Sequence, residues 1–423
     1  MFKLPRGTRD FSPEEMQKRR FVEGSMKETF ESFGYKEVQT PVFETLELFT
    51  AKSGEGIIDE LYSFIDKGGR NLALRPELTA PVIRMYIDNF QMDPKPIKMF
   101  YFGNCYRYDR PQKGRYREFK QAGCELIGTN TTEAYAELIA LSYTILKNVG
   151  LQDIKLKIGN LNILNSIFEK LDIPKDKTSY LTPLIDKEDF EGVLEALNDF
   201  DINPKKATEF LEVLQSSDNK KILDLIKEDK SAVKEYNNLE KIIALLKKSY
   251  KIENLELKIS IVRGLDYYKG IVFEIEAPKL GAEKQICGGG AYDLINLFEG
   301  RDSPQAGFAI GFDRTILALE TEKFEFPKMK LDVFIIPINE ELIEESIDIA
   351  HKLRKNKKTV DIDLLRRGIG KALKYASSMN ARYTIIIGPD ELEKKSVTVR
   401  NMETGNQDLV QITKINEFFK NEK

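Results

Sequence analysis

Apolar and polar residues follow a helical pattern near the start of the chain and an alternating pattern after it. Apolar side chains recur at helical spacing between Met16 and Phe33, behind a Ser-Pro-Glu-Glu start. The spacing predicts an amphipathic helix with Ser12 as its N-cap. The stretch YKEVQTPVFE then alternates as a strand, and Pro41 within it favours an edge or interface position.

A hairpin and a second helix are predicted next. PIKMFYFGNCYRYDR and EFKQAGCELIG are typical of strands, and the polar, glycine-bearing RPQKGRY between them predicts an extended hairpin loop. TTEAYAELIALSYTILKNVGL predicts a helix that Thr131 caps and Gly150 ends.

The pattern then changes twice along the chain. Residues 162–250 are rich in Leu, Ile, Lys, Glu and Asp at helical spacing, which predicts a helical insertion within a first domain, residues 1–325. Strand patterns return in LKISIVRGLDYYKGIVFEIEA and QICGGGAYD, and AGFAIGFDRTILALE predicts a strand or turn that leads into a helix. After the linker KFEFPKMK, strands and helices alternate, so residues 330–423 predict a small α/β domain.

Composition narrows the choice of function. A chain of 423 residues is long enough for two or three domains, and a net charge of −3 excludes a general electrostatic attraction to nucleic acid. The three cysteines lie far apart without C-x-x-C spacing, which argues against a zinc site or a disulfide framework. The opening residues have no signal-peptide core, and no apolar run approaches the roughly 18 residues of a membrane span. We therefore expect a cytoplasmic protein that makes no contact with a membrane.

Arginines concentrate in the predicted hairpin. Arg107, Arg110, Arg115 and Arg117 fall within eleven positions, and the next arginine is Arg263. A guanidinium group binds phosphate or carboxylate through two parallel hydrogen bonds, so rigid strand ends that carry several of them suit a phosphate-bearing ligand. A solvated hairpin of surface salt bridges accounts for the same pattern equally well.

Other stretches carry candidate chemistry beside an ordinary structural interpretation. In LALRPELTAPV, strand-like alternation places Glu77 and Thr79 on one face, where they suit an ammonium group, although a turn or helix cap explains them too. In VRGLDYYKGIVFE, a lone Arg263 precedes Tyr267 and Tyr268, which are equally compatible with core packing.

Glycines and a helix start complete the set of candidates. The three glycines of CGGGAYD are costly in a regular strand, which favours a close approach of the backbone to a ligand or, alternatively, a bulge or tight turn. In GFAIGFDRTILAL, Arg314 lies near a helix start, where it suits an anion or simply faces solvent.

In this order the motifs resemble one family. RGTRDFSPEE, LRPELTAP, YRYDRPQKGRYREFKQAGCE, RGLDYYKGIVFE, GGGAYD and GFAIGFDR, followed by an α/β tail with IGKALKYA, are similar to histidyl-tRNA synthetase, a class II aminoacyl-tRNA synthetase. The resemblance implies an α/β (α+β) fold: an antiparallel-sheet catalytic domain with a helical insertion, and a C-terminal anticodon-binding α/β domain. It also implies a homodimer, formed through the first helix and the strand that ends at Pro41.

The resemblance assigns roles around ATP. Arg107 would bind the α-phosphate, Arg263 would face it from the opposite side, and Arg314 would hold the γ-phosphate, with Mg²⁺ as a companion of the nucleotide. Phe119 would stack on adenine and Asp109 would lie near it, at a position where the family commonly has glutamate. The metal ligands stay unassigned.

Histidine and tRNA sites follow in the same way. Glu77 and Thr79 would bind the ammonium group of L-histidine, with Gln121, Glu125, Tyr267 and Tyr268 around the imidazole. The hairpin loop would meet the acceptor end of tRNA(His) through Arg110, Gln112, Lys113, Arg115 and Arg117. The family's GGGRYD appears here as GGGAYD, so Ala291 removes one cation near the pocket.

Two alternatives compete with a histidine-tRNA ligase. Similar chains act as inactive, histidine-sensing regulatory subunits of ATP phosphoribosyltransferase, but these typically lack the tail and the catalytic arginines that stand here. A general ATP-dependent ligase for another small acid would leave the tail unexplained. The only histidine, His351, lies far in sequence from every motif, which favours a structural or surface role.

Overall fold

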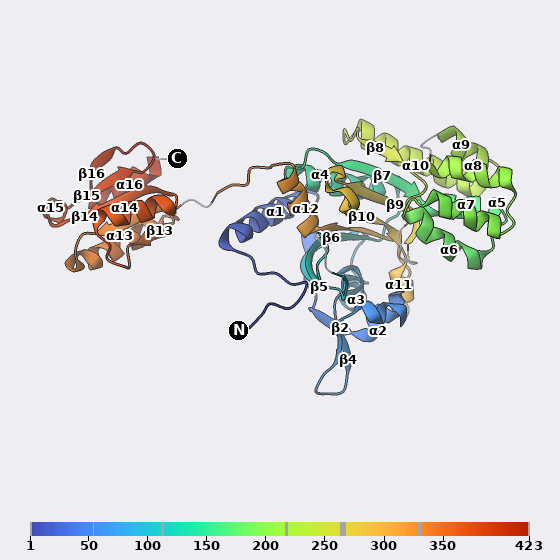
Figure 1. The fold of residues 1–423 in the computed structure, drawn as a ribbon, viewed down its shortest axis with the longest axis horizontal. Coiled ribbons are helices and arrows are strands. Elements are labelled where there is room, and N and C mark those ends of the chain that lie inside the picture. The colour runs from blue at the N-terminus through green and yellow to red at the C-terminus, as the bar shows by residue number, and fades with distance from the viewer. Residues whose placement is uncertain are drawn as a thin grey trace. The chain divides into compact units, whose positions relative to one another are not determined.

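The computed structural model describes residues 2–53, 55–110, 114–215, 219–262, 268–328 and 331–421. The chain divides into two units, Met1–Phe326 and Pro327–Lys423 (Figure 1). The first unit holds a large sheet, covering helices and a helical lobe. The second is a smaller α/β unit with its own core.

The centre of the first unit is an eight-stranded sheet in the order β1-β5-β6-β11-β10-β9-β7-β8. The outermost pairs, β1 with β5 and β7 with β8, are parallel, and the pairs between them are antiparallel. Its strands are β1 (Lys36–Glu37), β5 (Ile97–Tyr106), β6 (Glu118–Ile127), β7 (Lys155–Asn160), β8 (Leu255–Leu257), β9 (Tyr268–Glu276), β10 (Gln285–Tyr292) and β11 (Gln305–Gly311). The arginine-bearing hairpin is thus β5 and β6, as the sequence predicts.

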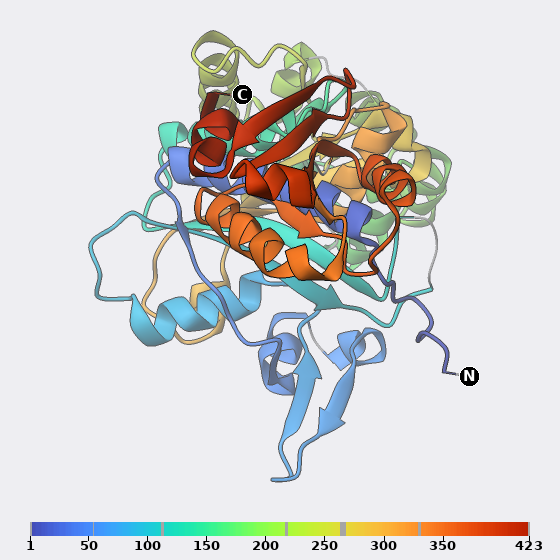
Figure 2. The ribbon, with the colours of Figure 1, turned by 90° about the vertical axis from the view of Figure 1, so that its left-hand side faces the viewer.

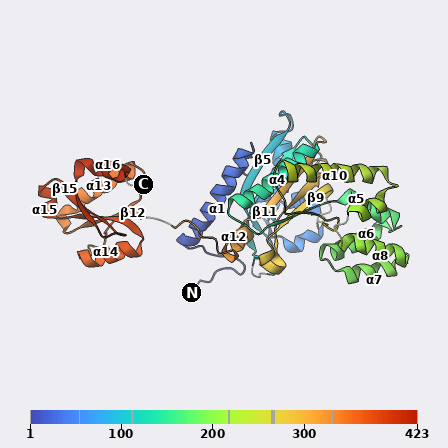
Figure 3. The same cartoon turned by 90° about the horizontal axis from the view of Figure 1, so that it is seen from above.

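Long helices cover one face of this sheet: α1 (Pro13–Ser32), α4 (Thr132–Asn148) and α10 (Lys230–Lys248), seen from above in Figure 3. The predicted caps of the first two are confirmed. The Ser12 side chain accepts the Glu15 N–H at 3.2 Å, and Glu15 Oε2 accepts the Ser12 N–H at 2.8 Å. Thr131 caps α4 in the same manner, accepting the Ala134 N–H at 3.2 Å.

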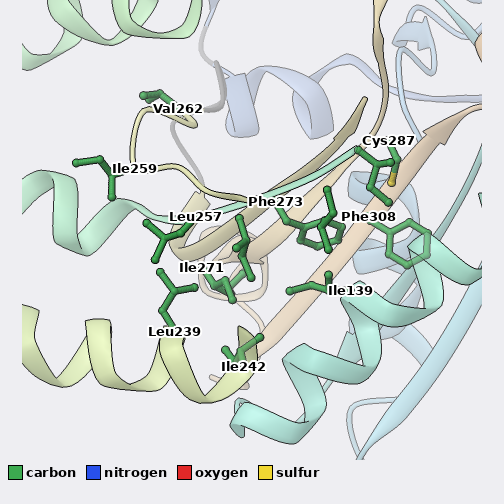
Figure 4. Close-up of a cluster of buried hydrophobic side chains, with 14 of the residues drawn as sticks. Ile139, Leu239, Ile242, Leu257, Ile259, Val262, Ile271, Phe273, Cys287 and Phe308 are labelled. Atoms are coloured by element: carbon green, nitrogen blue, oxygen red, sulfur yellow. The ribbon is translucent and has the colours of Figure 1, made fainter. Parts of the chain in front are cut away.

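Apolar side chains join these helices to the sheet. Figure 4 shows Leu239 and Ile242 of α10 and Ile139 of α4 directed toward Ile271 and Phe273 of β9, and all five are buried. Burial of side chains of this size stabilises the fold by about 1.5–3 kcal/mol each. Side chains alternate along β9, so Ile271 and Phe273 both face the helices, and the opposite face of the sheet is left to other elements.

Between β7 and β8 along the chain, the residues form a helical lobe, which Figure 1 shows in green and yellow. Its helices are α5 (Leu161–Lys170), α6 (Lys175–Asp186), α7 (Phe190–Asp199), α8 (Pro204–Gln215), α9 (Asn219–Ile226) and α10. Their buried Leu, Ile and Phe side chains continue the core beneath α4. Each helix buries one apolar face, so the apolar residues recur at helical spacing, and this spacing predicts the helices.

The opposite side of the large sheet carries a second sheet and short helices. The three-stranded sheet has the order β2-β4-β3 and stands out from the rest of the unit in Figure 2. The elements on this side are β2 (Phe43–Thr45), α2 (Leu46–Ser53), β3 (Ser63–Ile65), β4 (Asn71–Leu74), α3 (Thr79–Asn89) and α11 (Leu294–Leu297). The single strand predicted from YKEVQTPVFE is wrong: β1 and β2 belong to different sheets, and Pro41 lies between them.

The second unit is a five-stranded sheet in the order β13-β12-β14-β15-β16, flanked by helices. Its elements are β12 (Leu331–Pro337), α13 (Ile343–Lys355), β13 (Val360–Ile362), α14 (Ile369–Ser378), β14 (Ala381–Ile387), α15 (Pro389–Glu393), β15 (Ser396–Asn401), β16 (Gln407–Gln411) and α16 (Ile415–Asn421). The first three strands of the order are parallel and the others antiparallel. The predicted mixed α/β class with an antiparallel main sheet is confirmed.

The glycine triplet runs through the middle of strand β10, not through a tight turn. Gly289 and Gly290 pair with Phe308 and Gly307 of β11 in regular register. A Cβ on Gly289 would come within 2.3 Å of the Gly307 carbonyl oxygen, and one on Gly290 would come within 2.5 Å of the Ile271 carbonyl oxygen. Crowding by the neighbouring strands therefore requires these two glycines, while Gly288 lines the cleft described below.

We expect Gly289→Ala to destabilise the first unit by about 1–3 kcal/mol, because backbone atoms of β11 cannot move away from the new methyl group. Gly24→Ala in α1 is the matched control, since its Cβ would meet nothing within 4 Å and alanine favours a helix by about 1 kcal/mol. Thermal unfolding followed by circular dichroism should show a lower midpoint for the first variant only. Equal midpoints would contradict the crowding argument.

Candidate active site

A cleft of about 570 Å³ opens beside β5, β6, β10 and β11, within the usual range for a small-molecule site. Many residues proposed from the sequence meet on its wall: Glu77, Thr79, Arg107, Asp109, Arg115, Phe119, Gln121, Tyr268 and Arg314. These residues are distributed over more than 230 positions of the chain, and the sheet order brings them together.

The other proposed residues fall into two groups. Gln112, Lys113, Arg263 and Tyr267 fall outside the described residues. Arg110 is exposed on the hairpin and does not line the cleft. The Arg117 side chain also stays off the cleft wall, because its Nε donates to the Asp109 carbonyl oxygen at 3.1 Å and its guanidinium lies 4.0 Å from the Tyr108 ring centroid.

Arg107 is held in place by the backbone beside it. Its Nε donates to the Pro76 carbonyl oxygen at 3.0 Å, and its guanidinium carbon lies 5.3 Å from the centroid of the Phe119 ring. No carboxylate among the described residues forms an ion pair with Arg107. Its terminal nitrogens are therefore suited to a ligand oxygen, and the Phe119 ring lies nearby as a flat apolar surface.

Arg314 occupies the third position of helix α12 (Phe312–Thr321), which follows β11. Its Nη1 donates to the Gln285 carbonyl oxygen at 2.9 Å, its Nε donates to the Gly114 carbonyl oxygen at 3.3 Å, and its Nη2 pairs with Glu283. Glu283 ends the 3₁₀ segment Pro278–Glu283. These contacts connect α12 to the hairpin loop at Gly114.

Three guanidinium groups share this end of the cleft. Burial lowers the pKa of Arg314, and the nearby charges of Arg115 and Arg107 lower it further, although Glu283 opposes the change. Like charges brought together in a partly dehydrated site repel each other, and an anion between them relieves the repulsion. The geometry thus favours a polyanionic ligand such as a nucleotide triphosphate.

The cleft wall also carries Glu77 and Thr79. Glu77 accepts the N–H groups of Thr79 at 2.7 Å and Ala80 at 3.1 Å, so it caps the start of helix α3. The strand-like alternation used to place this pair on one face is therefore wrong, because the helix begins at Thr79. Both side chains nevertheless line the cleft, where a carboxylate and a hydroxyl group suit an ammonium group.

Glu125 lies behind the cleft wall and is fully buried. The Tyr101 hydroxyl group donates to its Oε1 at 2.8 Å, and the Tyr292 hydroxyl group donates to its Oε2. Burial raises the pKa of Glu125 to about 8, while these hydrogen bonds lower it. Tyr292 lines the cleft and Glu125 does not. The Glu125 carboxyl group is therefore connected to the cleft by its hydrogen bond with the Tyr292 hydroxyl group.

Two glycines make room for this buried cluster. A Cβ on Gly307 would lie 1.9 Å from Glu125 Oε2, and one on Gly123 would lie 2.7 Å from the Tyr101 hydroxyl oxygen. Tyr101 and Gly123 are direct cross-strand partners in the hairpin. Tyr101 was missed from the sequence, and a large polar aromatic residue opposite a glycine is the signal that points to it.

Ala291 and Tyr292 lie on opposite faces of strand β10. Tyr292 packs with Tyr101 and Leu78 on the cleft side, whereas Ala291 belongs to the apolar core beneath α4 and is 8% exposed. The expectation that Ala291 removes a cation near the pocket is therefore wrong for this chain. Strand alternation directs that side chain away from the cleft.

Metal-binding groups are sparse among the described residues, which contain no cluster of three or more His, Cys, Asp or Glu side chains able to hold an ion. Asp109 and Glu274 are carboxylates on the cleft wall. The three cysteines, Cys105, Cys124 and Cys287, are buried and free. None of the described helices has both the length and the apolar composition needed to cross a membrane.

Comparisons with known proteins agree along the whole chain. Residues 7–315 match the family model for histidyl-tRNA synthetase, and residues 332–422 match an anticodon binding domain. A histidine-tRNA ligase of Methanocaldococcus jannaschii is 44% identical over 425 residues, with 99% of each chain covered. One from Archaeoglobus fulgidus is 44% identical over 406 residues, covering 96% of each. The apo histidyl-tRNA synthetase of S. aureus has a similar structure, with a TM-score of 0.74 and 30% identity over 99% of this chain and 100% of that one.

We expect the pH dependence of stability to differ between the native chain and Glu125→Gln. Because the folded-state pKa is about 8 against an ordinary 4.5, the folded chain retains a proton that the unfolded chain releases between these values. Stability of the native chain should therefore fall with rising pH across this window, by up to about 1.4 kcal/mol per pH unit, relative to the non-titrating amide. The thermal midpoints of the native chain and of Glu125→Gln, measured from about pH 5 to pH 9, should diverge up to about pH 8 and change in parallel above it. Parallel profiles throughout would refute the buried, protonated carboxyl group.

Proposed function

The chain belongs to the histidyl-tRNA synthetase family, and we propose that its cleft is where histidine is activated with ATP before transfer to tRNA(His). It is a histidine-tRNA ligase, which forms histidyl-adenylate and releases pyrophosphate, and then transfers histidine to the 3′ end of the tRNA and releases AMP. The observation that carries the site assignment is the convergence of Arg107, Arg115 and Arg314 in one cleft that Glu77 and Thr79 also line.

In this proposal the arginine end binds ATP. Arg107 binds the α-phosphate and Arg314 the γ-phosphate, while Phe119 stacks on adenine and Asp109 lies beside it. Arg263 is assigned to the α-phosphate opposite Arg107 by its place in the RGLDYY motif. The fixed position of Arg107 supports this arrangement, since a guanidinium already held by Pro76 loses little freedom when a phosphate binds.

The first step needs no protein base. The histidine carboxylate is ionised at neutral pH and attacks the α-phosphorus of ATP, and pyrophosphate leaves. Catalysis then rests on positioning and on neutralising negative charge at the phosphorus oxygens, which fixed guanidinium groups supply. The one histidine of the chain fits this account, because His351 is exposed on α13 in the second unit.

Magnesium is part of the proposal as a companion of the nucleotide. This ion usually binds through one or two carboxylates together with substrate phosphates and water. The carboxylate of Glu274 on the cleft wall fits that pattern, and it would hold the ion at the phosphates. When bound, Mg²⁺ supplies further neutralisation of phosphate charge.

The part of the cleft around Glu77 and Thr79 is proposed to select histidine. Glu77 and Thr79 receive the ammonium group, while Gln121, Tyr267, Tyr268 and the Glu125–Tyr292 pair surround the imidazole ring. Imidazole presents a donor and an acceptor at fixed separation, so a ligand without them would leave buried polar groups unpaired. Sites of this type discriminate by about 10⁴-fold or better without an editing step.

Transfer to tRNA is the second step. The terminal tRNA hydroxyl group attacks the adenylate carbonyl carbon, AMP leaves, and we propose that a non-bridging phosphate oxygen of the adenylate takes the hydroxyl proton. The acceptor end is assigned to the hairpin through Arg110, Gln112, Lys113, Arg115 and Arg117. The second unit is assigned to the anticodon, supported by exposed Lys371 and Lys374 on α14.

A homodimer is also part of the proposal. The three-stranded sheet exposes apolar side chains on β2, on β3 and at the residue before β2. Val42, Phe43, Phe64 and Ile65 are 42%, 52%, 43% and 70% exposed. The Phe43 and Phe64 rings lie 6.4 Å apart on β2 and β3, the two edge strands that flank β4. Exposed apolar groups gathered in this way suit an interface between two copies. We propose that tRNA charging takes place in the cytoplasm.

The regulatory-subunit alternative receives no support. The relatives named as ligases match almost the full chain, including the anticodon-type unit. Arg107 and Arg314 both line the cleft, where a chain that only senses histidine has no use for them.

Histidine-dependent exchange of radioactive pyrophosphate into ATP tests the proposed activity. We expect the purified chain to show exchange with histidine and none with other amino acids at equal concentration, because only imidazole pairs with both edges of the pocket. Histidine binding without exchange would favour the regulatory role instead.

Arg263→Ala should lower the rate of adenylate formation by several orders of magnitude while histidine affinity stays nearly unchanged. The proposed contact strengthens mainly in the transition state, so its loss affects kcat more than ground-state binding. Single-turnover kinetics and calorimetry with histidine measure the two quantities. A variant with normal turnover would remove Arg263 from the catalytic set.

A further inference from the structure

The RGTRD segment before helix α1 lies directly against the hairpin. The Gly7 carbonyl oxygen accepts the N–H groups of Arg117 at 2.9 Å and Glu118 at 3.4 Å, at the start of strand β6. Gly7 has a φ of 85°, and a Cβ there would lie 2.7 Å from Arg117 Cγ. The segment is therefore fitted closely to the strand that leads out of the loop.

Arg9 continues this contact toward the cleft. Its guanidinium carbon lies 3.4 Å from the centroid of the Tyr116 ring, and its Nη2 donates to Asp313 Oδ1 at 2.8 Å. Tyr116 belongs to the hairpin loop, and Asp313 directly precedes Arg314. A single side chain from outside the cleft thus contacts the hairpin loop and the start of α12.

Asp313 is a junction between these parts. It is 9% exposed, and besides Arg9 it accepts Arg19 Nη1 at 2.6 Å and the Lys120 backbone N–H at 2.8 Å. Arg19 reaches Asp313 from helix α1 and packs on Phe312, with no contact to Tyr116 among the interactions of the described residues. Arg9 and Arg19 therefore share the same carboxylate but differ in their contact with the loop.

We propose that Arg9 is a positioning residue for ATP: it holds the hairpin loop against α12 so that the phosphate-binding guanidinium groups face a common point. Among the described loop residues, Gly114 is joined to α12 by its carbonyl oxygen on Arg314, and Tyr116 by its ring on Arg9, which pairs with Asp313. Loss of the second contact leaves the first, a long hydrogen bond of 3.3 Å, among these described residues. Arg115, between the two, would then be held by the Gly114 contact and by the ion pair of its Nε with Asp109 Oδ2 at 3.2 Å. This inference rests on the proposed binding of ATP in the cleft.

The selective readout is the ratio of two affinities. Arg9 touches the nucleotide end and none of the residues proposed for histidine, so Arg9→Ala should raise the Kd of a non-hydrolysable ATP analogue about 5- to 20-fold and leave the Kd of histidine within about twofold. Isothermal titration calorimetry on the full-length chain measures both. Arg9→Lys retains a cation for Asp313 but lacks a flat stacking group, and it should weaken ATP binding in the same direction while preserving the fold.

Arg19→Ala is the matched control, because it removes the other partner of Asp313 Oδ1. It should lower the thermal midpoint as much as Arg9→Ala does, yet keep the ratio of the two Kd values. A double-mutant cycle of Arg9→Ala with Tyr116→Ala should show clear non-additivity for ATP binding, because the two residues act through one contact.

Several results would overturn the inference: no change in ATP affinity for Arg9→Ala, an equal loss of both ligands, the same selective loss for Arg19→Ala, or additive effects in the cycle. Failure of pyrophosphate exchange in the native chain would instead count against the proposed function. The ATP-binding measurement does not depend on turnover, so the two failures are distinguishable.

Discussion

The cleft depends on holding like charges close together in a partly dehydrated place. Arg107 and Arg314 are held by backbone carbonyl groups at Pro76, Gly114 and Gln285, so their positions are set by the fold before a ligand arrives. Burial lowers the pKa of Arg314, and the nearby charges of Arg115 and Arg107 lower it further. A site built in this way stabilises an anion without reorganising, which is the condition for electrostatic catalysis.

Close packing of the strands shapes the part of the cleft in front of Glu125. A carboxyl group at Glu125 can lie between strands only because Gly307 and Gly123 lack side chains, and two tyrosine hydroxyl groups satisfy its oxygens. The same strands need Gly289 and Gly290 for contact between their backbones. Glycines in this sheet are therefore requirements of packing, and the position of Glu125 behind the cleft wall depends on them.

Coupling between separate parts of the first unit runs through one buried carboxylate. Asp313 joins the segment before α1, helix α1, strand β6 and helix α12. Arg314 follows it directly, and of the two arginines on this carboxylate Arg9 also contacts the hairpin loop at Tyr116. This arrangement explains how a segment with no catalytic group contributes to the site.

The sequence by itself determined the elements with strong local signals and the family. Ser12 and Thr131 cap their helices as predicted, the hairpin has its predicted strands, and the motifs, those around Arg107 and Arg314 among them, identify the family. These features depend on neighbours along the chain, on helical or alternating periodicity, and on motifs.

Only the tertiary structure decided which side chains face the cleft. It placed Ala291 in the core, put Glu125 behind Tyr292, replaced the expected alternation at Glu77 by a helix start, and revealed Tyr101 and Arg9. The helix start at Glu77 rests on local hydrogen bonds to Thr79 and Ala80. The others depend on strands or segments far apart in sequence that pack side by side, and no local pattern records which strand will be the neighbour.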